Sequence, residues 1–72
     1  MDMKEKIALL EETFEMDEGS LSADMLLDDV DEYDSITKLS LIVMLEDEFN
    51  KKITGAEIKE FVTVQDILDI MQ

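Results

Sequence analysis

Apolar residues recur every three or four positions along the first part of the chain. Four of them follow one another at steps of four, three and four: Met3, Ile7, Leu10 and Phe14. This spacing places them on one face of a helix, and it predicts an amphipathic helix over residues 2–16. Asp2 suits the positive end of that helix, and Gly19 lies where such a helix is expected to stop.

Residues 17–33 show no sustained period and predict a long connection. Its scattered apolar residues are expected to fill the core from the loop: Leu21, Met25, Leu27 and Val30. A second helix is predicted from Ser35 to Phe49 or Asn50, with Asp34 as its N-cap.

Two shorter helices are predicted near the C-terminus. Thr54 and Glu57 have the spacing of a capping box, and the helix they open is expected to end near Phe61. Thr63 is expected to cap a last helix with one apolar stripe: Val64, Ile67, Leu68 and Met71. No segment alternates as a strand does. The predicted fold class is all-α, a small four-helix bundle with a long first loop and a short third helix, in which residues 1–72 form one domain.

The second helix carries more apolar residues than one buried face needs. On a wheel of about 100° per residue, one stripe is expected to face the core: Leu41, Ile42, Leu45 and Phe49. A second stripe lies roughly opposite: Ile36, Leu39 and Val43. Ser35 lies at the head of this second stripe, and Glu46 and Asp47 flank it. Either neighbouring helices cover both sides, or the second stripe is a docking surface for a partner with an apolar groove and a basic rim.

The charge of the chain limits its partners. Twenty acidic and six basic residues give a net charge of −14. Such a surface repels nucleic acid and anionic membranes and attracts basic partners. No apolar run reaches the roughly 18 residues of a membrane helix, and no basic segment leads into an apolar one, which predicts a cytoplasmic location.

The residue types also limit the chemistry. The chain has no Cys and no His, which removes the thiolate nucleophile, the disulfide, the usual general base and the commonest metal ligand. Catalysis by this chain alone is not expected. Asp29 and Asp31 begin like a calcium loop, but Asp34 stands where that loop needs Gly and Ser40 where it needs Glu. No specific metal site is predicted.

Ser35 has an ordinary and a functional interpretation. Serine is common at helix starts, where its hydroxyl competes for free backbone N–H groups. Alternatively, a phosphate ester on Ser35 would lie at a helix N-terminus, where unpaired N–H groups and the helix dipole favour an anion. Without a neighbouring His or Cys, Ser35 is not an activated nucleophile. Another enzyme would have to modify it.

Three segments resemble parts of acyl carrier proteins. The segment LLDDVDEYDSI, residues 26–36, is similar to the lead-in to their Asp-Ser-Leu motif, with Ile36 in place of Leu. LEDEF, residues 45–49, resembles the acidic end of their second helix, and TVQDILDIM, residues 63–71, resembles their last helix. Glu32 and Tyr33 before the Asp-Ser pair are similar to free-standing carriers with Glu-Trp-Asp-Ser. Lys38 and Ser40 stand where fatty-acid carriers often have Thr and Glu.

The resemblance implies that Ser35, next to Asp34, carries 4′-phosphopantetheine transferred from coenzyme A by a phosphopantetheinyl transferase. The thiol of this arm would hold acyl groups as thioesters for partner enzymes of fatty acid, polyketide or related biosynthesis. Partner enzymes with basic docking surfaces would contact Asp34 together with the second stripe and its acids: Ile36, Leu39, Val43, Glu46 and Asp47. The carrier is expected to be a monomer. A carrier of aminoacyl or peptidyl groups, such as D-alanyl, and an unmodified acidic adaptor remain alternatives. Asp34 favours acyl over peptidyl cargo.

Overall fold

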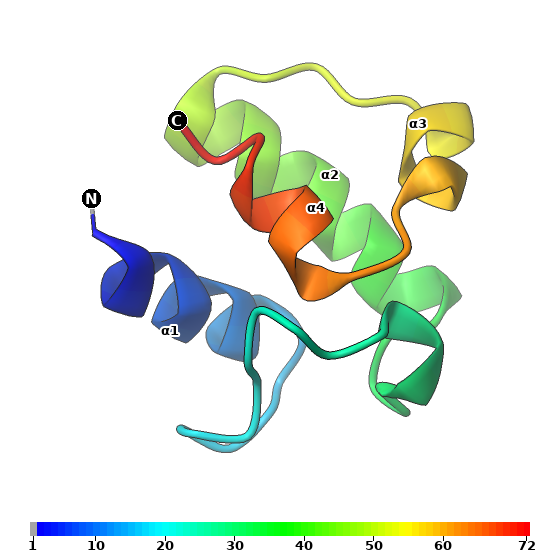
Figure 1. Ribbon diagram of the computed structural model, residues 1–72. Helices are drawn as coiled ribbons and strands as arrows, with labels where there is room; N and C mark the ends of the chain where they lie inside the picture. The colour runs from blue at the N-terminus through cyan, green and yellow to red at the C-terminus, as the bar shows by residue number, and fades with distance from the viewer. Residues whose placement is uncertain (1) are drawn as a thin grey trace.

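Four α-helices and one short 3₁₀ turn form the computed structural model of the protein, which describes residues 2–72 (Figure 1). Its elements are α1 (Met3–Thr13), η1 (Leu27–Asp29), α2 (Ser35–Phe49), α3 (Gly55–Glu60) and α4 (Val64–Leu68). The part of the chain described contains no strand beyond one isolated bridge. The all-α class, the long first connection and the short third helix are thus confirmed.

α1 is shorter than the predicted helix over residues 2–16. The Asp2 carboxylate caps its start by accepting the Glu5 N–H at 2.8 Å. The helix ends at Thr13, and Glu15 then adopts a left-handed φ of 58°. A left-handed residue after the last turn is the common way to end a helix. The expectation that Gly19 marks the end is therefore wrong, because Glu15 takes that conformation first.

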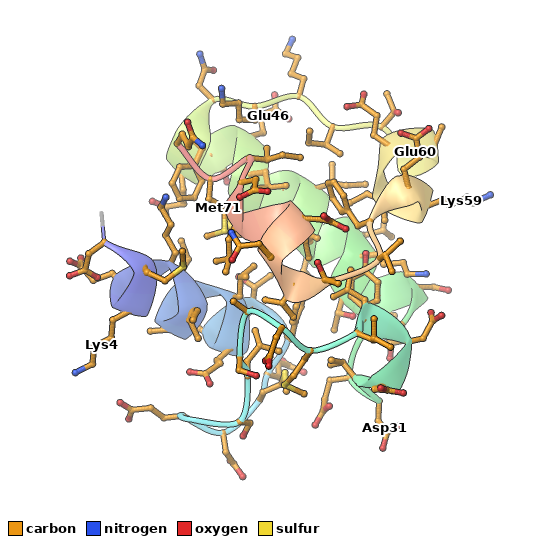
Figure 2. The ribbon with its side chains drawn as sticks, viewed as in Figure 1. Lys4, Asp31, Glu46, Lys59, Glu60 and Met71 are labelled. Carbon is orange, nitrogen blue, oxygen red and sulfur yellow. The ribbon has the colours of Figure 1, made fainter. Side chains whose placement is uncertain are left out.

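The core is one cluster of buried side chains to which α1, the first connection, α2, α3 and α4 all contribute. It consists of Leu10, Phe14, Leu21, Leu27, Val30, Leu41, Met44, Leu45, Ile58, Val64, Ile67, Leu68 and Met71. Every apolar residue of the last predicted stripe belongs to it, although α4 itself ends at Leu68. The first connection supplies three core residues as predicted, while Met25 packs against the core from outside. In contrast, charged side chains such as Asp31 and Glu46 project outward (Figure 2).

Two expectations about buried faces need correction. Met3, expected on the buried face of α1, is 46% exposed. On α2, Leu41 and Leu45 are buried as predicted, but Ile42 and Phe49 are only partly buried, and Met44 is buried instead. The wheel gave the correct number of stripes, but the helices packed against α2 decide where the centre of its buried face lies.

The first connection is held in place by hydrogen bonds to distant segments. The Leu27 N–H donates to the Val62 carbonyl oxygen at 2.9 Å, which ties the loop to the link between α3 and α4. The buried Glu11 carboxylate of α1 accepts the Leu21 N–H at 3.0 Å. Buried backbone groups need such partners, so these bonds allow a long loop to cover the core.

The short helices begin at their predicted caps. The Thr63 hydroxyl accepts the Asp66 N–H at 3.3 Å while the Asp66 carboxylate accepts the Thr63 N–H at 3.1 Å, a full capping box. At α3, the Thr54 hydroxyl accepts the Glu57 N–H. In a full box the Glu57 carboxylate would accept the Thr54 backbone N–H, but here it accepts the Thr54 hydroxyl at 3.3 Å. The predicted box is therefore only partly formed.

No helix within residues 2–72 has both the length and the apolar character needed to cross a membrane.

Leu45 offers a direct test of this core. Its side chain is fully buried, so Leu45→Ala removes packed methyl groups and should lower the free energy of unfolding by about 2–5 kcal/mol. The matched control is Leu39→Ala on the exposed side of the same helix, which should change it by no more than about 0.5 kcal/mol. Chemical denaturation followed by circular dichroism measures both. Equal losses would mean that the buried face of α2 is assigned wrongly.

Candidate functional site

The start of α2 is fixed by the side chain of Asp34. This residue has an extended backbone, and its carboxylate accepts the N–H groups of Ile36 and Thr37, both at 3.0 Å. Asp34 is therefore the N-cap that the sequence predicted. Because Ser35 is the first residue of the helix, the cap also fixes the backbone that carries the Ser35 side chain.

Thr37 completes this cap, and sequence reasoning missed it. The Thr37 side chain is buried. Its hydroxyl accepts the Asp34 N–H at 2.8 Å and donates to the Glu32 carbonyl oxygen at 2.6 Å. The Asp-x-x-Thr spacing was the available signal, since Thr37 takes the place that Glu or Gln holds in the usual capping box. Residues on both sides of Ser35 are thereby held by one small set of hydrogen bonds.

These hydrogen bonds have an electrostatic effect. The Thr37 backbone N–H, together with the Thr37 hydroxyl and the Ile36 N–H, holds the pKa of Asp34 below its usual value. The carboxylate thus stays ionised and keeps two N–H groups of the first turn occupied. The expectation that a phosphate on Ser35 would find these groups unpaired is wrong for Ile36 and Thr37.

Ser35 is exposed and lines a groove between α2 and α3. This groove has a volume of about 370 Å³. Three apolar side chains line it: Leu39, Ile42 and Ile58. Lys38 and Lys59 also line it. The site therefore combines an accessible hydroxyl, an apolar surface and two cations.

The second stripe of α2 is exposed. Ile36, Leu39 and Val43 are 74%, 65% and 57% exposed, and Glu46 and Asp47 beside them are exposed as well. The alternative in which neighbouring helices cover both sides of α2 is therefore wrong. Three large apolar side chains in a row on one exposed face are unusual for a surface with no binding role.

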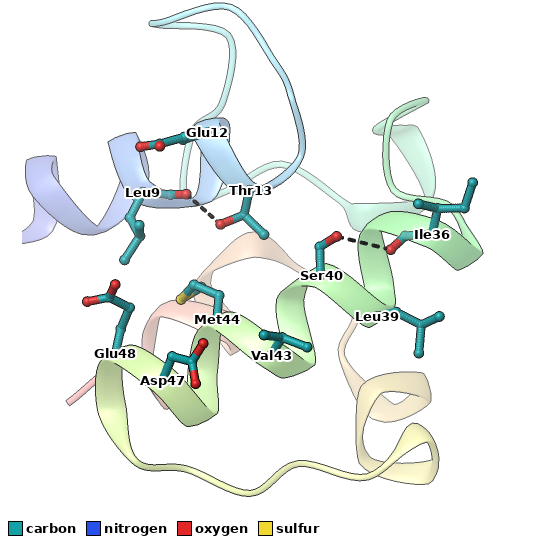
Figure 3. Close-up of a pocket in the computed structure, with 10 residues that line it drawn as sticks. All are labelled: Leu9, Glu12, Thr13, Ile36, Leu39, Ser40, Val43, Met44, Asp47 and Glu48. Carbon is teal, nitrogen blue, oxygen red and sulfur yellow. Dashed lines mark hydrogen bonds between the residues drawn. The ribbon is translucent and has the colours of Figure 1, made fainter.

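A second groove, of about 570 Å³, extends the stripe toward α1 (Figure 3). The stripe residues line it from α2, and Leu9 lines it from α1. Its acidic residues come from both helices and are Glu12, Asp47 and Glu48, whereas Glu46 lies outside it. Sequence reasoning missed Leu9 and Glu12, because only the packing of α1 on α2 brings them to the stripe. It also missed Glu48, which lies on α2 itself beside Asp47.

Comparison with known families identifies the chain. A sequence model described as the phosphopantetheine attachment site matches residues 7–71, nearly the whole chain. The chain belongs to this family. Neither the curated proteins nor the solved structures that were compared contain a match.

Membership of the family has chemical consequences. The cofactor of the carrier is a covalent 4′-phosphopantetheine, installed by a phosphopantetheinyl transferase, and the carrier serves partner enzymes without being an enzyme itself. The residues at the start of α2 fit such a group. Ser35 offers an exposed hydroxyl, and the groove beside it presents apolar surface to an aliphatic arm.

The pKa of Asp34 predicts how the stability of the carrier depends on pH. Because the folded pKa is lowered, the stabilisation is complete above the unfolded value of about 3.8 and is lost as the pH falls through the folded pKa. Asp34→Asn should therefore lower the thermal midpoint at pH 7, and the difference from the wild type should shrink at pH 3.

Asp31→Asn is the control for this experiment, because it removes the same charge from an exposed residue nearby. It should not lower the midpoint at pH 7. An Asp34→Asn difference that persists unchanged at pH 3 would show that the charge of the cap does not contribute.

Proposed function

We propose that the chain is an acyl carrier protein and that Ser35 is the residue to which its 4′-phosphopantetheine is attached. The observation that carries this proposal is an exposed serine, fixed on the first turn of α2 by the Asp34–Thr37 cap, beside an apolar groove. When bound, the arm supplies a terminal thiol that holds acyl groups as thioesters. The thiol that the chain lacks thus comes from the cofactor.

Ser35 is favoured over the other three serines by its surroundings. Ser20 and Ser22 lie in the first connection, where the Ser22 hydroxyl donates to Asp24 at 2.8 Å. Ser40 lies inside α2, and its hydroxyl donates to the Ile36 carbonyl oxygen at 3.3 Å. Ser35 is the serine that opens a helix, and it follows the Asp that caps that helix.

The carrier positions Ser35, and the transferase supplies the catalytic groups that modify it. Asp34 and Thr37 fix the backbone at Ser35, so its side chain leaves the first turn of α2 from a fixed position. A serine hydroxyl needs a general base to become a nucleophile. No His occurs in the sequence, so the transferase is the enzyme that must take the Ser35 proton.

The groove beside Ser35 supports acyl cargo over aminoacyl cargo. Leu39, Ile42 and Ile58 offer apolar surface, which an alkyl chain would bury favourably. An aminoacyl group carries a free ammonium, and Lys38 and Lys59 on the same groove would repel it. We therefore place the carrier in fatty acid, polyketide or related biosynthesis.

Partner enzymes would dock on the exposed stripe and its acids. Ile36, Leu39 and Val43 supply apolar contact, and Glu46 and Asp47 attract a basic surface. Rim charges mainly set the rate of association and its salt dependence. A carrier that visits several enzymes in turn benefits from fast association with modest apolar contact.

Modification of Ser35 can be measured directly. Incubation with coenzyme A and a broad-specificity phosphopantetheinyl transferase should add the mass of one phosphopantetheine to the wild type, and Ser35→Ala should gain none. Ser40→Ala, five residues further along α2, is the matched control and should be labelled fully. Intact-protein mass spectrometry reads all three. A labelled Ser35→Ala variant, or a wild type that no transferase labels, would contradict the proposal.

Docking can be tested with the same transferase. Glu46→Lys combined with Asp47→Lys should lower kcat/KM about tenfold at low ionic strength, because it reverses the charge beside the stripe. The loss should shrink in high salt. Val43→Asp should also lower kcat/KM, through loss of apolar contact.

The control for docking is Asp17→Lys combined with Glu18→Lys. These two residues are also consecutive in sequence and exposed, and the double substitution changes the net charge by the same amount. It should leave kcat/KM nearly unchanged, with helicity checked for every variant. If both pairs act alike, only the total charge matters and the stripe is not the docking surface.

A further inference from the structure

Two of the six basic residues of the chain lie at the candidate attachment site. Lys38 on α2 and Lys59 on α3 line the same groove as Ser35. The others lie in two pairs elsewhere: Lys4 and Lys6 on α1, and Lys51 and Lys52 between α2 and α3. In a chain with twenty acids, this placement puts two positive charges beside Ser35.

Lys38 is held toward the start of α2. It follows Ser35 by three residues, so the two side chains lie on neighbouring parts of the helix surface. Side chains in a helix lean toward its N-terminus. Accordingly, the Lys38 ammonium nitrogen lies 5.0 Å from the centre of the Tyr33 ring, two residues before Ser35. An ammonium over an aromatic face is a favourable cation–π contact.

The Tyr33 ring is itself well fixed. It meets the buried Phe14 ring edge-on, with the ring centres 5.5 Å apart and an interplanar angle of 67°. This contact anchors Tyr33 to the core through Phe14, the C-cap residue of α1. The ring therefore acts as a rigid support for the Lys38 ammonium, next to the residue that would carry the arm.

The phosphate of an arm on Ser35 would need such a cation. A phosphodiester adds a negative charge beside Asp31, Glu32 and Asp34 in a chain that already carries −14. The N–H groups of Ile36 and Thr37 cannot compensate it, because the Asp34 carboxylate already accepts them. A cationic side chain close to Ser35 would supply that compensation.

We propose that Lys38 is the counter-ion of the phosphodiester that joins the arm to Ser35. This inference rests on the proposed attachment to Ser35. The helix dipole disfavours a cation near the start of α2, and an anion on Ser35 reverses that cost. Lys59 is less suited, because it is exposed, lies in the last turn of α3 where the dipole already favours it, and projects outward (Figure 2).

The test compares the thermal midpoints of the unmodified and modified forms of each variant. The difference between the midpoints of the two forms excludes any effect that a substitution has before modification, including loss of the Tyr33 contact. At low salt, modification should lower the midpoint of Lys38→Gln by about 2–5 °C more than that of the wild type. The extra loss should vanish near 1 M salt, and Lys38→Arg should behave as the wild type.

Lys51→Gln is the matched control, since it removes the same charge just beyond the far end of α2. It should show the wild-type change. An equal change in Lys38→Gln and Lys51→Gln would overturn the inference, and so would an extra loss seen only with Lys59→Gln. Peptide mass spectrometry shows whether Ser35 carries the arm. If it does not, the proposed function fails; if it does and the midpoints of the variants change equally, only the role of Lys38 fails.

Discussion

The reciprocal hydrogen bonds between Asp34 and Thr37 fix the first turn of α2, and the candidate site depends on that turn. They set the backbone of Ser35 and the direction in which α2 leaves the loop. That direction places Leu41 and Leu45 in the core. The Asp34 carboxylate also occupies two amides of the first turn, which could otherwise bind an anion.

The charge of the carrier is compatible with folding because it is kept outside a small core. The core is almost entirely apolar, and Glu11 is the one acid buried in residues 2–72. Its carboxylate receives the Leu21 N–H and so pins the loop that covers the core. Eighteen of the other nineteen acids are exposed, so folding does not desolvate them, and they can attract basic partners. The exposed acids thus serve both solubility and the recognition of partners.

The excess of apolar residues in α2 has a similar double role. Leu41, Met44 and Leu45 bury one side of the helix, while Ile36 and Val43 remain exposed on another. Exposed apolar residues add nothing to the stability of the isolated chain. Their contiguity, the groove that continues them toward α1 and the acids around them are what a docking surface needs. Lys38 at the neighbouring groove has the opposite charge and serves the arm, on our proposal, rather than the partner.

The sequence by itself determined the features that depend on neighbours a few residues apart. The Asp34 cap, the bounds of α2, the Thr63 cap and the two stripes of α2 follow from capping chemistry and helical period, which act within one or two turns. Only the tertiary structure decided which part of α2 faces the core, where Met44 is buried while Ile42 and Phe49 are only partly buried. It alone also brought Glu12 of α1 to the exposed stripe and Lys59 of α3 to the Ser35 groove. These placements depend on how helices distant in the chain pack together, and the period of a single helix carries no information about the position of its neighbours.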